Sequence, residues 1–263
     1  MAEYNLTIVK TEYLLPNIVS MLLDISAVTE EIRPGQFFQV TCGGDTYLRR
    51  PISVCDVTVY EGHPVLRLVL EVKGKGTHLL AEKKVGDSLC VLGPFGNGFN
   101  LKDVKKVDLI GGGLGVCPLF YLTRALLEKG VETRVFLGFR NQAAIFLTEE
   151  FKALGADVTV STDDGSFGEK GYAINVYKAN YTGKPDMLYT CGPQVMMNTV
   201  VAFADEQGIL YQESREERMG CGFGACLVCA CKMQDDSMGH VCKDGPVFGT
   251  GMVAVGGKVA HHG

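Results

Sequence analysis

The chain has 263 residues, 46% of them hydrophobic, which is enough to bury a large core divided over two or three units. A net charge of −5 without a basic patch argues against a nucleic-acid partner, and no apolar run reaches the roughly 18–20 residues that span a bilayer. The first residues lack the basic and apolar regions of a secretory signal. We therefore expect a cytoplasmic protein that binds neither nucleic acid nor membrane and keeps its ten cysteines reduced.

Residues 1–100 predict short strands separated by glycine-rich turns. The strands are expected at 6–10, 18–24, 37–40, 52–60, 65–72 and 88–92. One short helix is expected at 77–81. Several strands at this spacing are typical of a small antiparallel barrel.

From residue 101 to residue 210, predicted strands alternate with predicted helices. The strands are expected at 104–110, 133–139, 157–161 and 187–190, and the helices from the glycines at 111–115 to about 129, at 143–154 and at 194–207. Such alternation predicts a parallel sheet with helices on both faces. With a small cysteine-rich unit over 211–263, the predicted fold class is a multidomain β and α/β protein: an antiparallel barrel, a parallel-sheet nucleotide-binding domain and a C-terminal metal-cluster domain.

The loop Gly111-Gly-Gly-Leu-Gly115 lies where a predicted strand ends and a helix begins. Glycines there allow a pyrophosphate to approach backbone N–H groups at the positive end of the helix. The loop departs from the common dinucleotide fingerprint, because Val116 and Pro118 follow it and Arg140, not an acidic residue, ends the next strand. Arg140 would suit a 2′-phosphate or a ribose alike, so these residues leave NAD and NADP undecided. Packing glycines give a similar pattern, and the loop alone is a weak signal.

Five of the ten cysteines fall between residues 221 and 242. Cys221, Cys226, Cys229 and Cys242 have the spacing C-x4-C-x2-C-x12-C, which is the plant-type spacing for a [2Fe–2S] cluster. Glycines among them let backbone N–H groups approach the sulfur atoms. Zinc also takes four thiolates, usually from two short knuckles. A ligand set with Cys231 in place of Cys229 remains open, and the role of Cys231 is undecided.

Five segments occur in the order and spacing of the ferredoxin–NAD(P) reductase superfamily, which the chain resembles. They are Arg50-Pro-Ile-Ser53, Gly74-Lys-Gly-Thr77, Gly93-Pro-Phe-Gly96, the loop from Gly111 to Pro118, and Cys191-Gly-Pro193. The resemblance implies that the barrel binds FAD through Arg50, Pro51, Ile52, Ser53, Val69, Leu70, Glu71, Gly76 and Thr77. It implies that NAD contacts Gly111, Gly112, Gly113, Gly115, Pro118, Cys191, Gly192 and Pro193. Arg50 would pair with the FAD pyrophosphate and Ser53 would reach toward the flavin ring. No side chain is expected to act as a catalytic acid or base.

The tail from Glu217 to Phe248 is similar to the electron-transfer subunits of class 1B dihydroorotate dehydrogenases, and the likeness covers nearly the whole chain. It implies a [2Fe–2S] cluster on Cys221, Cys226, Cys229 and Cys242. It also implies a partner subunit that oxidises dihydroorotate on FMN, in an α2β2 heterotetramer. Electrons would pass through the cluster and FAD to NAD+, within de novo pyrimidine (UMP) biosynthesis.

Two alternatives stay open. Small flavin subunits of ferredoxin-linked NAD(P) reductases and of sulfide dehydrogenases share much of the pattern. A protein of another class, a non-catalytic redox or metal sensor, would bind zinc through its cysteine tail. The apolar residues around the cysteines suit either a docking face or a core; they are Met219, Phe223, Leu227 and Val228.

Overall fold

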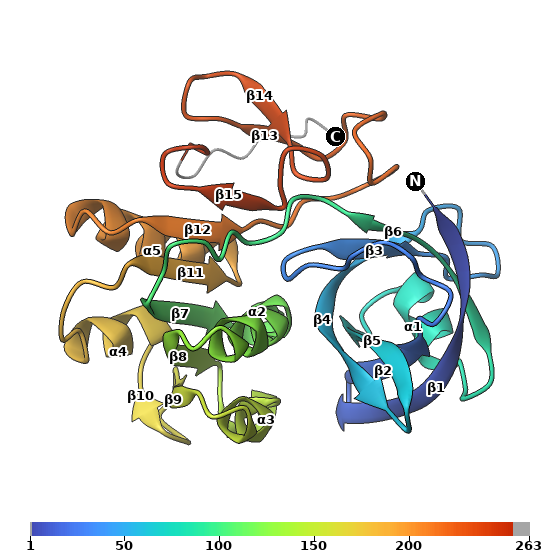
Figure 1. Ribbon diagram of the computed structural model, residues 1–263, viewed down its shortest axis with the longest axis horizontal. Helices are drawn as coiled ribbons and strands as arrows, with labels where there is room; N and C mark the ends of the chain where they lie inside the picture. Colours follow the sequence, from blue (N-terminus) through green and yellow to red (C-terminus); the bar gives the residue numbers. More distant parts are fainter. Residues whose placement is uncertain (1, 255–263) are drawn as a thin grey trace.

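A computed structural model describes residues 2–254 and shows a barrel, a helix-covered sheet and a smaller C-terminal unit that contacts both (Figure 1). Residues 255–263 of the expected C-terminal unit lie outside the described residues. No helix in the described part of the chain is long and apolar enough to cross a membrane.

The N-terminal unit is a closed antiparallel barrel, as predicted. Its strands are β1 (Glu3–Leu15), β2 (Ile18–Asp24), β3 (Phe37–Val40), β4 (Arg50–Tyr60), β5 (His63–Glu71) and β6 (Ser88–Phe95), in the order β1-β2-β5-β4-β3-β6, with helix α1 (Lys75–Ala81) between β5 and β6 in the chain. Side chains alternate across each strand. On β3, Phe38 and Val40 enter the barrel core, whereas Phe37 and Gln39 contact the C-terminal unit. Strand β3 is therefore a wall that the two units share.

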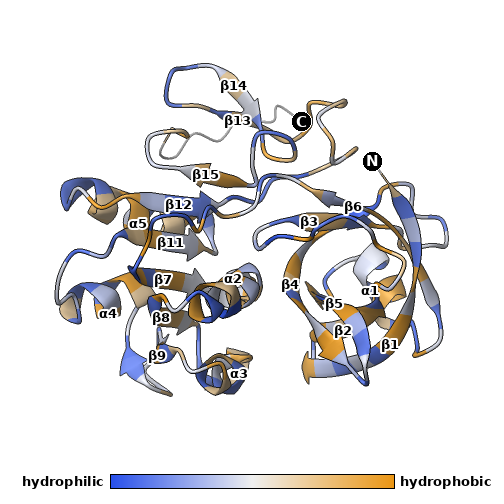
Figure 2. Cartoon of the chain, in the orientation of Figure 1, coloured by the Kyte–Doolittle hydropathy of each residue, from blue (hydrophilic) through white to orange (hydrophobic). Residues whose placement is uncertain are grey.

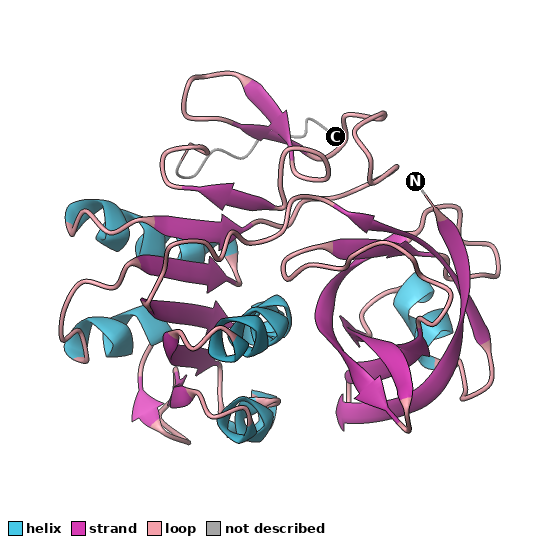
Figure 3. Ribbon diagram, viewed as in Figure 1, coloured by secondary structure: helices cyan, strands magenta, loops and turns pink. Residues whose placement is uncertain are grey.

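The second unit is a seven-stranded sheet with helices on both faces, which confirms the predicted α/β architecture (Figure 3). Its strands, in spatial order, are β10 (Glu169–Lys170), β9 (Asp157–Thr162), β8 (Glu132–Phe139), β7 (Lys106–Gly112), β11 (Met187–Cys191), β12 (Tyr211–Ser214) and β15 (Val247–Gly249). All pairs are parallel except β12 with β15. Helices α2 (Val116–Glu128) and α3 (Thr148–Ala153) cover one face, and α4 (Ala173–Ala179) and α5 (Gln194–Glu206) the other. Apolar residues concentrate on the barrel strands and on the central strands of the sheet (Figure 2).

Two local expectations were wrong, and several short elements were not predicted. The helix expected at 143–154 is split into a 3-10 turn (Gln142–Ala144) and α3, because Leu147 has a φ of +63° that a helix does not allow. The strand expected at 104–110 ends two residues later, so Gly111 and Gly112 belong to β7 and pair with β8. Helix α4 and the strands after residue 210 were not predicted, since each is too short to show a period.

The barrel and the sheet are joined by ion pairs. Arg124 of α2 binds both carboxylate oxygens of Asp56 on β4, with Nε–Oδ1 at 2.9 Å and Nη2–Oδ2 at 2.5 Å. Arg67 of β5 pairs with Glu150 of α3 in the same way. Bidentate pairs fix orientation as well as distance, so the two units are held at a defined angle.

The C-terminal unit is attached to both larger units. It contains the hairpin β13 (Ala230–Lys232) and β14 (Met238–His240), and then β15, which enters the sheet. Ahead of β15, the carbonyl of Gly245 accepts the Asn97 N–H of the barrel side (2.7 Å) and the carbonyl of Pro246 accepts the Arg215 N–H (2.8 Å). The sheet thus continues past residue 210, and the boundaries 1–100, 101–210 and 211–263 stay predictions about functional units.

Candidate functional site

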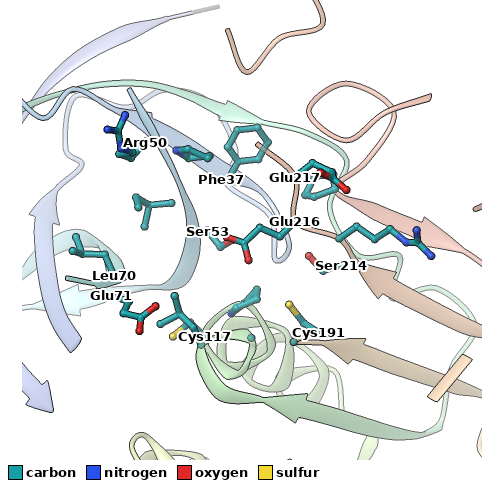
Figure 4. Close-up of a pocket in the computed structure, with 18 of the residues that line it drawn as sticks. Phe37, Arg50, Ser53, Leu70, Glu71, Cys117, Cys191, Ser214, Glu216 and Glu217 are labelled. Atoms are coloured by element: carbon teal, nitrogen blue, oxygen red, sulfur yellow. The ribbon is translucent and has the colours of Figure 1, made fainter. Parts of the chain in front are cut away.

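A cleft of about 860 Å³ lies between the barrel and the sheet, in the size range of roughly 300–1,000 Å³ that is usual for ligand sites. Strands β4 and β5 form one side, and the ends of β7 and β11 form the other. The segment 214–219, which follows β12, closes it toward the C-terminal unit (Figure 4). Ligands of parallel sheets bind at the carboxyl ends of the strands, which is where this cleft opens.

The barrel side of the cleft brings together eight of the nine residues expected to bind FAD. They are Arg50, Pro51, Ile52, Ser53, Val69, Leu70, Glu71 and Thr77. Gly76 does not line the cleft. A Cβ added there would lie 3.0 Å from Nε of Arg50 and 2.9 Å from Sγ of Cys42, so Gly76 makes room for the guanidinium. One guanidinium nitrogen of Arg50 donates to the Leu48 carbonyl at 2.6 Å, which orients the side chain at one end of the cleft.

The opposite side brings together six of the eight residues expected to contact NAD. They are Gly112, Gly115, Pro118, Cys191, Gly192 and Pro193. Gly111 instead packs under α2, where a Cβ would lie 2.9 Å from Cδ1 of Leu119. Gly113 turns the chain at a φ of +53°. Arg140 is exposed at the end of β8 and does not line the cleft.

The Gly115 backbone lies against the end of β11. A Cβ on Gly115 would lie 2.4 Å from the Cys191 carbonyl oxygen and 2.5 Å from Cα of Gly192, well inside van der Waals contact. The glycine loop and the Cys191-Gly192-Pro193 turn are therefore packed together as one edge of the cleft.

Sequence reasoning missed several residues that line the cleft. They include Phe37, Ser214, Arg215 and Glu216. The Glu216 carboxylate extends to the side of Ser53, with Ser214 and Cys191 on the facing side (Figure 4). For Ser214, Arg215 and Glu216 the signal was the end of a parallel strand, but β12 has only four residues and was not recognised.

The thiols of this cleft are held in the neutral form. Burial, with a smaller effect of the Glu216 carboxylate, raises the pKa of Cys191 to about 12. Burial also raises the pKa of Cys117, which lies in contact with the Cys55 thiol. The cleft has Arg50 at one end and apolar side chains such as Ile52, Val69 and Leu70 along the barrel side. This arrangement fits a ligand that has phosphates at one end and a flat ring at the other. The residues present therefore fit FAD.

The four predicted cluster cysteines form two pairs. At the first pair, the N–H groups of Phe223, Ala225 and Cys226 donate to Sγ of Cys221 at 3.4, 3.2 and 3.4 Å, and the Cys221 N–H donates to Sγ of Cys226 at 3.3 Å. At the second, the Cys242 N–H donates to Sγ of Cys229 at 3.5 Å. Two thiolates for each of two irons is the set that a [2Fe–2S] cluster with four cysteines needs.

These contacts change the acidity of the thiols in opposite directions. Partial burial acts against ionisation of Cys221, but the N–H groups of Phe223, Cys226 and Ala225 outweigh it and lower its pKa to about 6. Burial and the neighbouring Cys229 raise the pKa of Cys242 to about 12. Metals bind cysteine as the thiolate, which is the form that the lowered pKa of Cys221 favours. Among the described residues, no three His, Cys, Asp or Glu side chains gather around one point as ligands of a single ion would.

The fifth cysteine of the region, Cys231, is buried in the small core of the C-terminal unit, and burial raises its pKa to about 11. Of the apolar residues around the loop, Met219 packs against this core. Phe223, Leu227 and Val228 are exposed, as is Cys226. The loop thus exposes three apolar side chains and one of the four predicted ligand cysteines.

Phe37 connects the cysteines to the cleft. Its side chain lines the cleft and is also part of the buried core that contains Cys229 and Cys242. Its ring centroid lies 5.8 Å from that of Phe95, whose ring is in turn 6.4 Å from that of Phe223 in the cysteine loop. Phe37 therefore borders both the cleft and the core that holds two of the predicted cluster cysteines.

Two family descriptions match this chain. Residues 216–254 match the iron–sulfur cluster binding domain of dihydroorotate dehydrogenase B, and residues 109–202 match the oxidoreductase NAD-binding domain. The chain is 41% identical over 218 residues to the dihydroorotate dehydrogenase B (NAD(+)) electron transfer subunit of Caldanaerobacter subterraneus subsp. tengcongensis, covering 82% of this chain and 84% of that one. It is 39% identical to the subunit of the same name from Bacillus cereus strain B4264, over 97% of this chain and all of that one.

Solved structures share the fold. A chain from the structure of an NADH-dependent reduced ferredoxin–NADP oxidoreductase has a TM-score of 0.85 and 30% identity, covering 96% of this chain and 91% of that one. The FAD/NAD-binding domain of a nitric oxide dioxygenase from Vibrio cholerae has a TM-score of 0.67 and 19% identity, covering 78% and 93%. The second likeness concerns the fold alone.

Proposed function

Because this chain belongs to the family of electron-transfer subunits of dihydroorotate dehydrogenase B (NAD+), we propose that it carries electrons from dihydroorotate oxidation on a partner subunit to NAD+, in pyrimidine synthesis. It is an oxidoreductase component that uses a [2Fe–2S] cluster, FAD and NAD. The observation that carries the proposal is the wall at Phe37, which borders both the cysteine core and the cleft.

Each part of the site has a task in this proposal. When bound, FAD supplies the exchange between single electrons and electron pairs that a cluster and a nicotinamide cannot make with each other. Arg50 would hold the pyrophosphate, and Gly76 and the Leu48 carbonyl position its guanidinium. Ser53 and Glu216 would border the flavin ring, while the packed edge at Gly115 and Cys191 would hold the nicotinamide within reach of it.

We propose that the partner is an FMN-containing catalytic subunit and that the assembly is an α2β2 heterotetramer. The apolar surface of Phe223, Leu227 and Val228, with Cys226 at its edge, supports docking of a protein at the cluster. Electrons would then enter at the surface and leave through the cleft. The expectation of a cytoplasmic location stays a prediction.

The test is an anaerobic absorption spectrum of the purified chain, with flavin, iron and sulfide assayed on the same sample. One FAD, two irons and two sulfides per chain are expected. Cys226→Ser should lose the cluster and keep FAD, whereas Cys231→Ser, the matched control from the same region, should keep both. A colourless chain that contains zinc would refute the proposal and favour the sensor.

A second candidate is the small flavin subunit of a ferredoxin-linked NAD(P) reductase, which the TM-score of 0.85 to a chain of such an enzyme favours. Copurification separates the two functions. An FMN-containing partner that forms orotate supports the first, and a larger partner with several iron–sulfur clusters supports the second.

A further inference from the structure

Gln39 is a buried amide without a partner. It lies on strand β3, in the wall between the barrel and the C-terminal unit, and its relative exposure is 0%. Neither Nε2 nor Oε1 has a hydrogen-bond partner among the described residues. Buried amides are nearly always hydrogen-bonded, because an unpaired one loses its bonds to water without replacement.

The other two buried glutamines of the described chain are satisfied. Gln36, directly before β3, accepts the Arg33 N–H at 2.8 Å and donates to the Gly96 carbonyl at 3.0 Å. Gln212 exchanges two hydrogen bonds of 2.9 Å with the backbone of Asn100. The unpaired amide is therefore a feature of position 39 and not of buried glutamines in this fold.

The Gln39 side chain points at the cysteine loop. A Cβ added to Gly222 would lie 2.6 Å from both Cγ and Nε2 of Gln39. Gly222 directly follows Cys221 and has a φ of +84°. The loop thus needs a glycine at this position both for its turn and for the approach of the amide, which places the amide beside the first cluster cysteine.

We propose that the Gln39 amide donates an N–H to a sulfur of the iron–sulfur cluster at Cys221, and thereby raises the cluster's reduction potential. The reduced cluster carries one more negative charge than the oxidised cluster, so a donor to sulfur stabilises the reduced form more. This inference rests on the cluster of the proposed function. It adds Gln39 of the barrel, about 180 positions before Cys221 in the chain, to the groups that set the cluster's reduction potential.

The first test is a redox titration of the full chain, monitored by electron paramagnetic resonance under anaerobic conditions. Gln39→Met keeps the length of the side chain and removes the donor. At a fixed potential, the ratio of reduced to oxidised cluster should fall by about tenfold, the effect of one hydrogen bond to a charged group. Gln36→Met is the matched control: it removes a satisfied amide from the same strand region and should leave the cluster's midpoint unchanged.

A second measurement does not depend on a variant that folds. Wild-type chain labelled with side-chain ¹⁵N-glutamine should show a ¹⁵N hyperfine coupling to the reduced cluster in pulsed electron paramagnetic resonance. No coupling, or an unchanged midpoint in a fully loaded Gln39→Met chain, overturns the inference and leaves the proposed function intact. A wild-type chain without iron and sulfide overturns the proposed function itself.

Discussion

The contact between Gly115 and the end of β11 predicts that Gly115→Ala damages the nicotinamide side of the cleft. Gly115 has a φ of −62° and a ψ of −11°, which alanine adopts freely, so the substitution acts only through space. The new Cβ would lie 2.4 Å from the Cys191 carbonyl oxygen, whereas ordinary contact begins at 3.4 Å. The loop and the Cys191 turn must therefore separate by about 1 Å, the difference between the two distances.

This displacement is expected to lower both the folding stability and the rate of NADH oxidation. Overpacking of a close contact costs about 1–3 kcal/mol of folding stability. A misplacement of about 1 Å between reacting groups lowers a rate by about 100-fold. We expect kcat/KM for NADH oxidation with an artificial electron acceptor to fall by about that factor, while FAD content stays unchanged because the barrel side is not touched.

Gly113→Ala is the matched control. Gly113 has a φ of +53° and open space around the position of a Cβ, so alanine costs about 1–2 kcal/mol of stability there but displaces nothing. The midpoint of thermal unfolding should therefore fall in both variants. Only Gly115→Ala should lower kcat/KM for NADH oxidation. Wild-type kcat/KM in Gly115→Ala, or equal kinetic losses in both variants, would refute the reasoning.

Three further predictions concern the other parts of the site. Cys226→Ala should abolish electron transfer with the partner subunit but spare NADH oxidation by artificial acceptors; simultaneous loss of both activities would contradict the division of tasks between cluster and flavin. Arg50→Ala should weaken FAD retention, because the pyrophosphate would lose the partly buried cation that pairs with it, and full flavin occupancy after gel filtration would argue against this role. Asp56→Ala should lower the free energy of unfolding by about 3 kcal/mol, because it leaves the Arg124 guanidinium without its anion. The Arg124 side chain is only 25% exposed, so water cannot fully replace the carboxylate. An unchanged urea midpoint would show that this ion pair does not join the barrel to the sheet.

Sequence reasoning succeeded where short segments carry strong chemical constraints. The cysteine spacing named the four residues that the structure brings together as two pairs, and the resemblance named eight residues on the barrel side of the cleft and six on the opposite side. Periodicity gave the barrel and the parallel sheet because long strands and helices repeat their pattern several times.

The same reasoning failed where tertiary contacts decide. Three consecutive glycines have different roles in the structure. Gly111 packs under α2, Gly112 is a strand residue that lines the cleft, and Gly113 forms a turn, and only their spatial neighbours distinguish them. Phe37 and Phe38 are adjacent and chemically identical, yet one borders the cleft and the other fills the barrel. The choice depends on which face of β3 meets the C-terminal unit, and that unit lies almost 200 residues away.

Strand β15, which follows the cysteine loop, also protects the sheet from aggregation, because it covers the edge at β12. Without β15, the N–H and C=O groups of β12 would form an open sheet edge next to the apolar core of the α/β unit. Open edges of this kind pair with other chains. Truncation before residue 245 should therefore yield a protein that aggregates, and the cysteine unit cannot be removed as an independent module. During synthesis of the chain, β15 (Val247–Gly249) must be complete before the edge of the sheet at β12 is protected from intermolecular pairing.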